Sequence, residues 1–156
     1  MRTSVIRAGR IEIEITDQAR GRLPAAELLR AARIIFGARA GRRPLTLTLL
    51  CVGARRMIAL NRRFKRHRGL TDVLSFESGE TDPDTGRLLV GEVIVCRPVA
   101  AREARARGLD EAGELLLYAV HGWLHLAGHD DGTPTQRRRM AAAERRILKK
   151  LGYRRD

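Results

Sequence analysis

The sequence predicts one α+β domain, in which a small, mostly mixed, four-stranded sheet packs against helices. Two observations support this fold class. Short apolar runs with strand character alternate with helical segments in the first hundred residues, and only helical patterns follow. The chain has 156 residues, which is enough to bury a core, and no repeat or low-complexity linker divides it. We therefore expect residues 1–156 to form a single domain.

Four segments are expected to form the strands, because each is short, apolar and followed by turn-forming residues. They span residues 10–15, 44–52, 71–76 and 88–96. In the first of them apolar and polar residues alternate, which is typical of an edge strand. Residues 77–86 are acidic and rich in turn-forming residues, so no element is expected there.

Helices are expected where apolar residues recur at helical spacing between capping residues. The five expected helices span residues 24–38, 54–65, the segment from Pro98 to Arg107, 110–127 and 135–150. The second helix is basic and is expected to turn four apolar side chains inwards: Met57, Ile58, Leu60 and Phe64. The first half of the fourth helix is apolar all round, which is typical of a buried helix.

The charge of the chain indicates a polyanionic partner. Its formal net charge is +13 at pH 7, and nucleic acid is the simplest partner for such a protein. A solvated, highly charged surface is the alternative, and charge alone leaves both open. No apolar run is long enough to cross a membrane, and the first residues lack the apolar run expected of a signal peptide. Cys51 and Cys96 lie in separate strand-like runs, so we expect buried reduced thiols and a cytoplasmic protein.

The segment HGWLHLAGHDD predicts a metal site on the buried helix. His121 and His125 are four residues apart and therefore share one helix face. Gly128 is placed to end the helix in a left-handed turn, which can bring Asp131 back towards both imidazoles. Two histidines and a carboxylate can hold one zinc ion with a position left open for chemistry. The alternative is that both histidines are core residues, but each buried nitrogen would then need its own partner.

His129 competes with Asp131 as the third ligand. It would lie one turn beyond His125 if the helix continued, and Gly128 argues against that continuation. We therefore favour Asp131. A peptidase is not expected, because the HExxH motif requires a glutamate as general base where this chain has Gly122.

A second group of residues lies between Asn61 and Phe76. Five of the residues from 62 to 68 are arginine or lysine, which suits a loop that holds phosphates. Together with the downstream runs VGEVIV and HGWLHLAGHDD, and with Met140 and Glu144 after them, the run TDVLSF resembles the YbeY family. The resemblance covers the chain from about residue 45 to residue 152.

The resemblance implies a zincin-like fold and a metal-dependent endoribonuclease of single-stranded RNA. It also implies a role in ribosomal RNA processing, at the 3′ end of 16S rRNA, and in ribosome quality control. Ribosomal RNA, with the ribosome or small-subunit proteins, would be the partner. Two alternatives stay open: a non-catalytic, metal-stabilised RNA-binding assembly factor, and a zincin-type hydrolase of another substrate.

Family positions can be carried onto this chain one by one. The metal ligands fall on His121, His125 and position 131, where the family has a third histidine and this chain has Asp131. Lys65 occupies the position of a functionally implicated arginine, and we expect it, helped by Arg66, to stabilise charge on the phosphate.

The neighbouring positions also differ from the family. Phe64 replaces a common tyrosine, and Leu70 replaces the usual proline. The group that removes the attacking proton is left open between His129 and Asp72, of which Asp72 is the better candidate for a structural cap.

Overall fold

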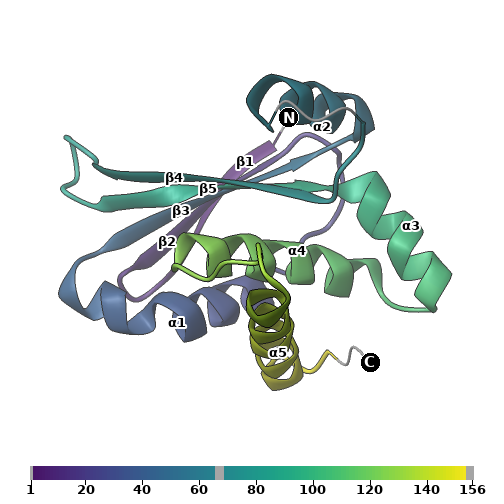
Figure 1. Cartoon of the computed structure of the whole chain (residues 1–156). Coiled ribbons are helices and arrows are strands. Elements are labelled where there is room, and N and C mark those ends of the chain that lie inside the picture. Colours follow the sequence, from purple (N-terminus) through teal and green to yellow (C-terminus); the bar gives the residue numbers. More distant parts are fainter. Residues whose placement is uncertain (1, 66–68, 154–156) are drawn as a thin grey trace.

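A computed structural model of the chain describes residues 2–65 and 69–153 (Figure 1). Its elements, in chain order, are β1 (Arg2–Ala8), β2 (Ile11–Asp17), α1 (Ala25–Arg42), β3 (Leu45–Val52), α2 (Ala54–Leu60), the π-helical turn η1 (Asn61–Lys65), β4 (Val73–Thr81), β5 (Leu88–Cys96), α3 (Arg97–Arg107), α4 (Glu111–Leu126) and α5 (Pro134–Lys150). In this described part, none of the helices is both long and apolar enough to span a bilayer.

The strands form one mixed sheet in the order β1-β2-β3-β5-β4. Strands β2, β3 and β5 run parallel, while β1 and β4 lie at the two edges and pair antiparallel with their neighbours. The predicted α+β class is confirmed. The predicted number of strands is wrong, because the described residues form five strands rather than four.

The strand expected at an edge, β2, lies inside the sheet between β1 and β3. The added stretches of strand lie at the two edges. Strand β1 pairs with β2 through the tight turn at Gly9, but most of its side chains are exposed and give no apolar pattern. Strand β4 continues to Thr81, beyond Phe76, and so occupies half of the stretch in which no element was expected. A bulge between Glu77 and Glu80 interrupts its pairing with β5, and its outer half is exposed on both faces. Because neither segment has a buried face, neither shows the pattern of apolar residues from which a strand is predicted.

Helix α4 lies at the centre of the molecule. It packs against β4 and β5 on one side and against α1, α3 and α5 on the others, which explains its apolar surface (Figure 1). Helix α2 lies on the opposite face of the sheet (Figure 1). Gly122 allows α4 to approach the sheet closely, because a Cβ at this position would meet Val93 Cγ1 at 2.7 Å. Position 122 therefore faces the sheet and leaves no room for the glutamate of a peptidase motif.

The segment between β3 and β4 differs from the expected helix. Met57 and Leu60 are buried as predicted, but Ile58 and Phe64 are 41% and 51% exposed. Ile58 follows Met57 by one residue and therefore points about 100° away from it. The π-helical turn has more residues per turn than an α-helix, which rotates Phe64 off the face of Leu60. Phe64 instead packs edge-on against Phe76, with ring centroids 5.5 Å apart.

The two cysteines are buried in neighbouring strands and are both free. Cys51 lies near the end of β3 and Cys96 at the end of β5. Burial raises the pKa of the Cys51 thiol to about 12, although the nearby Arg97 guanidinium opposes this shift.

Candidate metal centre

The turn after α4 is set by local backbone hydrogen bonds. Gly128 has a φ of 101°, in the left-handed region, as the sequence predicts. Its N–H donates to the carbonyl of His125 at 3.0 Å, and the N–H of His129 donates to the carbonyl of Leu124 at 2.9 Å. These two bonds form a Schellman motif, which reverses the chain and directs it back along α4.

The start of α5 holds the other end of this loop. The Thr133 hydroxyl accepts from the Gln136 N–H at 3.1 Å, and the Gln136 side chain accepts from the Thr133 N–H at 3.0 Å. This capping box fixes the residues just before the helix. Arg137 also donates to the carbonyl of Asp131 at 3.3 Å. The loop is therefore anchored at both ends, and Asp131 is held between them.

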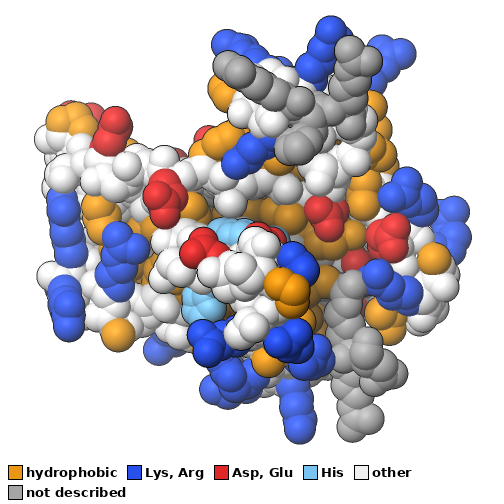
Figure 2. All heavy atoms as spheres, in the orientation of Figure 1, with side chains coloured by type: hydrophobic (Ala, Val, Ile, Leu, Met, Phe, Trp, Pro, Cys, Tyr) orange, Lys and Arg blue, Asp and Glu red, His pale blue; other side chains and the backbone are white. Residues whose placement is uncertain are grey.

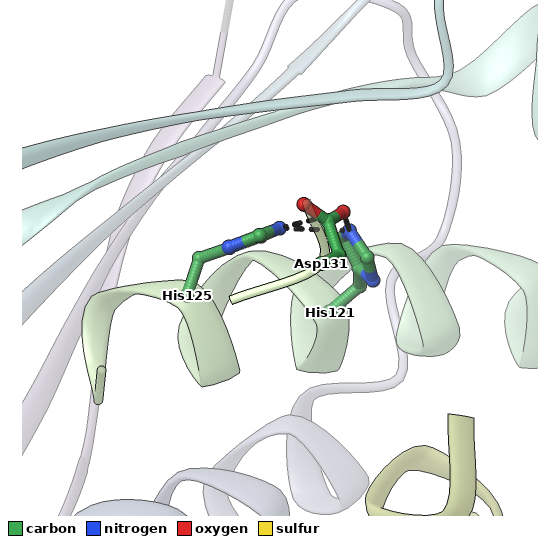
Figure 3. Close-up of side chains that lie close together, drawn as sticks. All are labelled: His121, His125 and Asp131. Atoms are coloured by element: carbon green, nitrogen blue, oxygen red, sulfur yellow. Dashed lines mark hydrogen bonds and ion pairs between the residues drawn. The ribbon is translucent and has the colours of Figure 1, made fainter. Parts of the chain in front are cut away.

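Three donor atoms converge where this loop passes α4 (Figure 3). Nε2 of His121 lies 3.1 Å from Nε2 of His125. Oδ2 of Asp131 lies 3.2 Å from Nε2 of His125 and 3.6 Å from Nε2 of His121. All three side chains are partly exposed, with 25%, 26% and 44% of His121, His125 and Asp131 accessible. The centre is thus reachable from solvent.

This triangle has the dimensions of a metal site. Ligands at 2.0–2.1 Å from a tetrahedral zinc ion lie about 3.3 Å from one another. The three measured separations bracket that value. Within the described residues, this is the one group of three or more histidine, cysteine or acidic side chains arranged to hold an ion. Its three donors would occupy one face of a tetrahedron and leave the fourth corner open.

Glu144 orients one of the histidines from a second helix. Its Oε1 lies 2.9 Å from Nδ1 of His121 and accepts that hydrogen bond. Donation from Nδ1 leaves Nε2 unprotonated in the neutral ring, with its lone pair directed at the other two donors. The Glu144 hydrogen bond raises the pKa of His121, and Glu144 and Asp131 add to this by charge attraction while burial opposes it.

The donor triangle opens into a cleft of about 560 Å³ between α4 and the edge strand β4. Lys65 reaches the opposite wall of the cleft, and its Nζ lies 5.1 Å above the ring of Phe76. Asn61, from the same π-helical turn, is buried in this wall and donates to the carbonyl of Gly69 at 3.2 Å. The turn therefore presents a cation to the metal centre from a separate part of the chain.

The other residues singled out in the sequence lie as follows. His129 is exposed, and among the described residues its side chain does not belong to the donor triangle or line the cleft. Asp72 lines the cleft, and its Oδ1 accepts from the N–H of Val73 at 2.8 Å, which fits a cap at the start of β4. Arg66, expected to assist Lys65, lies outside the described residues.

Glu144 was named in the sequence only as part of a family pattern, and no role was assigned to it. One signal could have pointed to it. It is the only acidic residue of α5, on a helix that otherwise carries seven basic residues. A single carboxylate on the partly buried side of a basic helix indicates a specific partner.

Comparisons with known proteins agree with this geometry. The family model described as Endoribonuclease YbeY matches residues 14–152. A protein named Endoribonuclease YbeY from Anaeromyxobacter dehalogenans is 40% identical over 143 residues, which cover 92% of this chain and 71% of the relative. A second protein of that name, from Halorhodospira halophila, is 43% identical over 108 residues, covering 68% of this chain and 70% of the relative.

A solved structure shows the same fold. The solution structure of a Thermotoga maritima protein aligns with a TM-score of 0.54 at 22% sequence identity. The alignment covers 88% of this chain and 91% of the other.

Proposed function

Because this chain belongs to the YbeY family of endoribonucleases, we propose that it is a hydrolase that cleaves phosphodiester bonds within single-stranded RNA. One observation supports this most directly. The donor triangle of His121, His125 and Asp131 opens into the same cleft that Lys65 enters from the other side. A metal ion and a cation facing each other across a cleft suit a phosphate group that carries increasing negative charge during the reaction.

The ion proposed for this site is zinc, although another divalent transition metal would fit the same donors. Nitrogen and carboxylate oxygen donors are ordinary zinc ligands, and their separations match a tetrahedral site. When bound, such an ion supplies a Lewis acid for a phosphoryl oxygen. Asp131, rather than His129, is proposed as the third ligand because the chain reversal at the Schellman turn brings Asp131, and not His129, close to the two imidazoles.

The protein side chains supply the remaining steps. Lys65 would hold a non-bridging phosphate oxygen, with Arg66 as its helper. His129 lies in the same loop as Asp131, two residues before it, and is proposed to move the attacking proton. Asp72 is the second candidate for that proton, and its bond to the Val73 N–H supports a structural role instead.

The biological role proposed for the chain is ribosomal RNA processing. More specifically, we propose maturation of the 3′ end of 16S rRNA and ribosome quality control in the cytoplasm, with the ribosome or small-subunit proteins as partners. The net charge of +13 supports an RNA partner of this kind. We also propose that residues 1–156 form one zincin-like domain, with α4 as the helix that carries two ligands.

Metal content and RNA cleavage, measured on the same preparations, test this proposal. Asp131→Ala should lose most of its bound metal and its cleavage of labelled single-stranded RNA, because two donors hold the ion poorly. His129→Ala should keep its metal and cleave more slowly. Asp131→His should bind zinc at least as well as the original chain.

The control is the double variant His121→Ala/His125→Ala, which should neither bind metal nor cleave. Cleavage by this variant at the original rate would reveal a contaminating nuclease and refute the proposed activity. Metal retained in Asp131→Ala and lost from His129→Ala would reverse the ligand assignment.

A further inference from the structure

A second hollow of the surface lies away from the metal centre. It has a volume of about 960 Å³ and lies between α1, the β1–β2 turn and the end of α5. Four basic side chains line it: Arg10, Arg30, Arg33 and Lys150. We call this hollow the α1–α5 groove. Among the described residues, no aspartate or glutamate lines it.

The charges of the groove are not neutralised within the described part of the protein. None of the four cations forms an ion pair with a described acidic side chain. Arg10 donates from Nε to the carbonyl of Ala40 at 2.8 Å, and Arg30 donates to the carbonyl of Lys150 at 3.0 Å. These bonds hold two of the cations in place and leave their positive charge unbalanced. Such a surface attracts an anion with several negative groups.

Two glycines of α1, Gly37 and Gly41, also line the groove. Glycine is unfavourable inside a helix, so its presence calls for a reason such as a positive φ or a close contact. Neither residue has a positive φ, and a Cβ at either position would meet nothing within 4 Å. The packing of this chain therefore does not require them. They keep the groove open to a group that approaches the helix backbone.

Helix α5 connects the groove with the metal centre. It begins three residues after Asp131 and ends at Lys150, about 25 Å along its axis. All seven of its basic side chains are exposed, and none forms an ion pair with a described acidic residue. Lysine and arginine side chains gather over α5 in the space-filling view (Figure 2). Exposed basic side chains therefore lie both near the start of α5, close to the loop that carries Asp131, and at its end beside the groove.

We propose that the α1–α5 groove binds the sugar–phosphate backbone of the RNA substrate at a distance from the bond that is cut. This inference rests on the proposed function and adds a docking site to it. Phosphates would contact the four cations, and the glycines would let the backbone of the RNA lie against α1. The groove would increase affinity for long substrates without taking part in cleavage.

The test compares RNA binding by the double variant Arg33→Gln/Lys150→Gln with that of the original chain. Both side chains are exposed, so the fold should persist. Loss of two phosphate contacts on a single strand should reduce the slope of log K against log salt by about 1.4 and weaken binding about tenfold at physiological salt. Cleavage of a short oligonucleotide that spans only the cleft should not change.

A second variant, Gly37→Gln/Gly41→Gln, fills the groove without changing the charge. Its melting temperature should stay the same or rise, because glutamine is the better helix former, while its affinity for long RNA should fall. The matched control is Arg2→Gln/Arg105→Gln, which removes the same charge from exposed sites outside the groove and the cleft. It should bind long RNA more tightly than Arg33→Gln/Lys150→Gln does.

The outcomes separate the inference from the proposed function. The inference would be overturned if both groove variants bound long RNA with the original affinity and salt slope. It would also be overturned if the matched control lost as much affinity for long RNA as the groove variants do. Failure of the original chain to cleave either substrate would instead overturn the proposed function.

Discussion

The hydrogen bond between Glu144 and His121 should govern how tightly the centre holds its metal. Glu144→Ala removes an acceptor that lies 2.9 Å from Nδ1 and whose side chain is only 15% exposed. Water replaces such a partner poorly, and the imidazole is then free to rotate or to place its proton on Nε2. Removal of the acceptor behind a metal-binding histidine weakens metal affinity about 10–100-fold, which corresponds to about 1.4–2.7 kcal/mol.

A hydrogen bond to a charged group makes a net contribution of similar size to protein stability, about 1.5–3 kcal/mol. We therefore expect Glu144→Ala to weaken zinc binding about thirtyfold, which is about 2 kcal/mol. Glu144→Gln keeps a neutral acceptor, so its free energy of zinc binding should weaken by about 1 kcal/mol, which is about fivefold in affinity. The order of affinities should be the original chain, then Glu144→Gln, then Glu144→Ala.

The measurement is a zinc titration against a chelating indicator, with circular dichroism to verify the fold. Glu14→Ala is the control, because Glu14 is an exposed carboxylate of β2 that lies outside the cleft. It should bind zinc with the original affinity. Unchanged zinc affinity in a folded Glu144→Ala variant would refute the orienting role of this carboxylate.

Two further predictions concern Lys65 and Cys51. Lys65→Ala should cleave RNA at least about tenfold more slowly with its metal content unchanged, while Lys65→Arg should keep or raise the rate; full activity of the alanine variant would show that this charge is incidental. The Cys51 thiol ionises near pH 8.5 when unfolded, but its folded pKa is about 12, so the free energy of unfolding should fall as pH rises between these values. In urea unfolding, the free energy of unfolding should fall by about 2 kcal/mol between about pH 8 and about pH 10, and this fall should be missing in Cys51→Ala. An identical pH dependence in both proteins would contradict the prediction.

The sequence predicted best those parts of the fold whose signals are local. Gly128 determines the turn after α4 through its own backbone preference, so the approach of Asp131 to the two histidines could be anticipated. The apolar surface of α4 likewise reflects burial on every side.

Other parts depend on contacts that no local pattern contains. The side chains of β1 are mostly exposed, so its strand conformation depends on pairing with β2 rather than on an apolar face. Phe64 was placed inwards on the assumption of α-helical rotation, which the π-helical turn changes. Glu144 meets His121 because α5 packs against α4, and a separation of 23 positions in the sequence gives no indication of this contact.

One wall of the cleft is formed by a single continuous segment of the chain, whereas the other is formed by segments that are distant in sequence. All three donors and Glu144 come from residues 121–144, one continuous segment of helix, turn and helix. The opposite wall, with Lys65 and β4, is positioned only when the sheet has assembled around β5. Contacts that are close in sequence form early and persist when distant ones open. Partial opening of the sheet edge should therefore abolish RNA cleavage while the protein still retains its ion. Bound metal would then show only that the helix–turn–helix segment is folded, whereas RNA cleavage would require the assembled sheet as well.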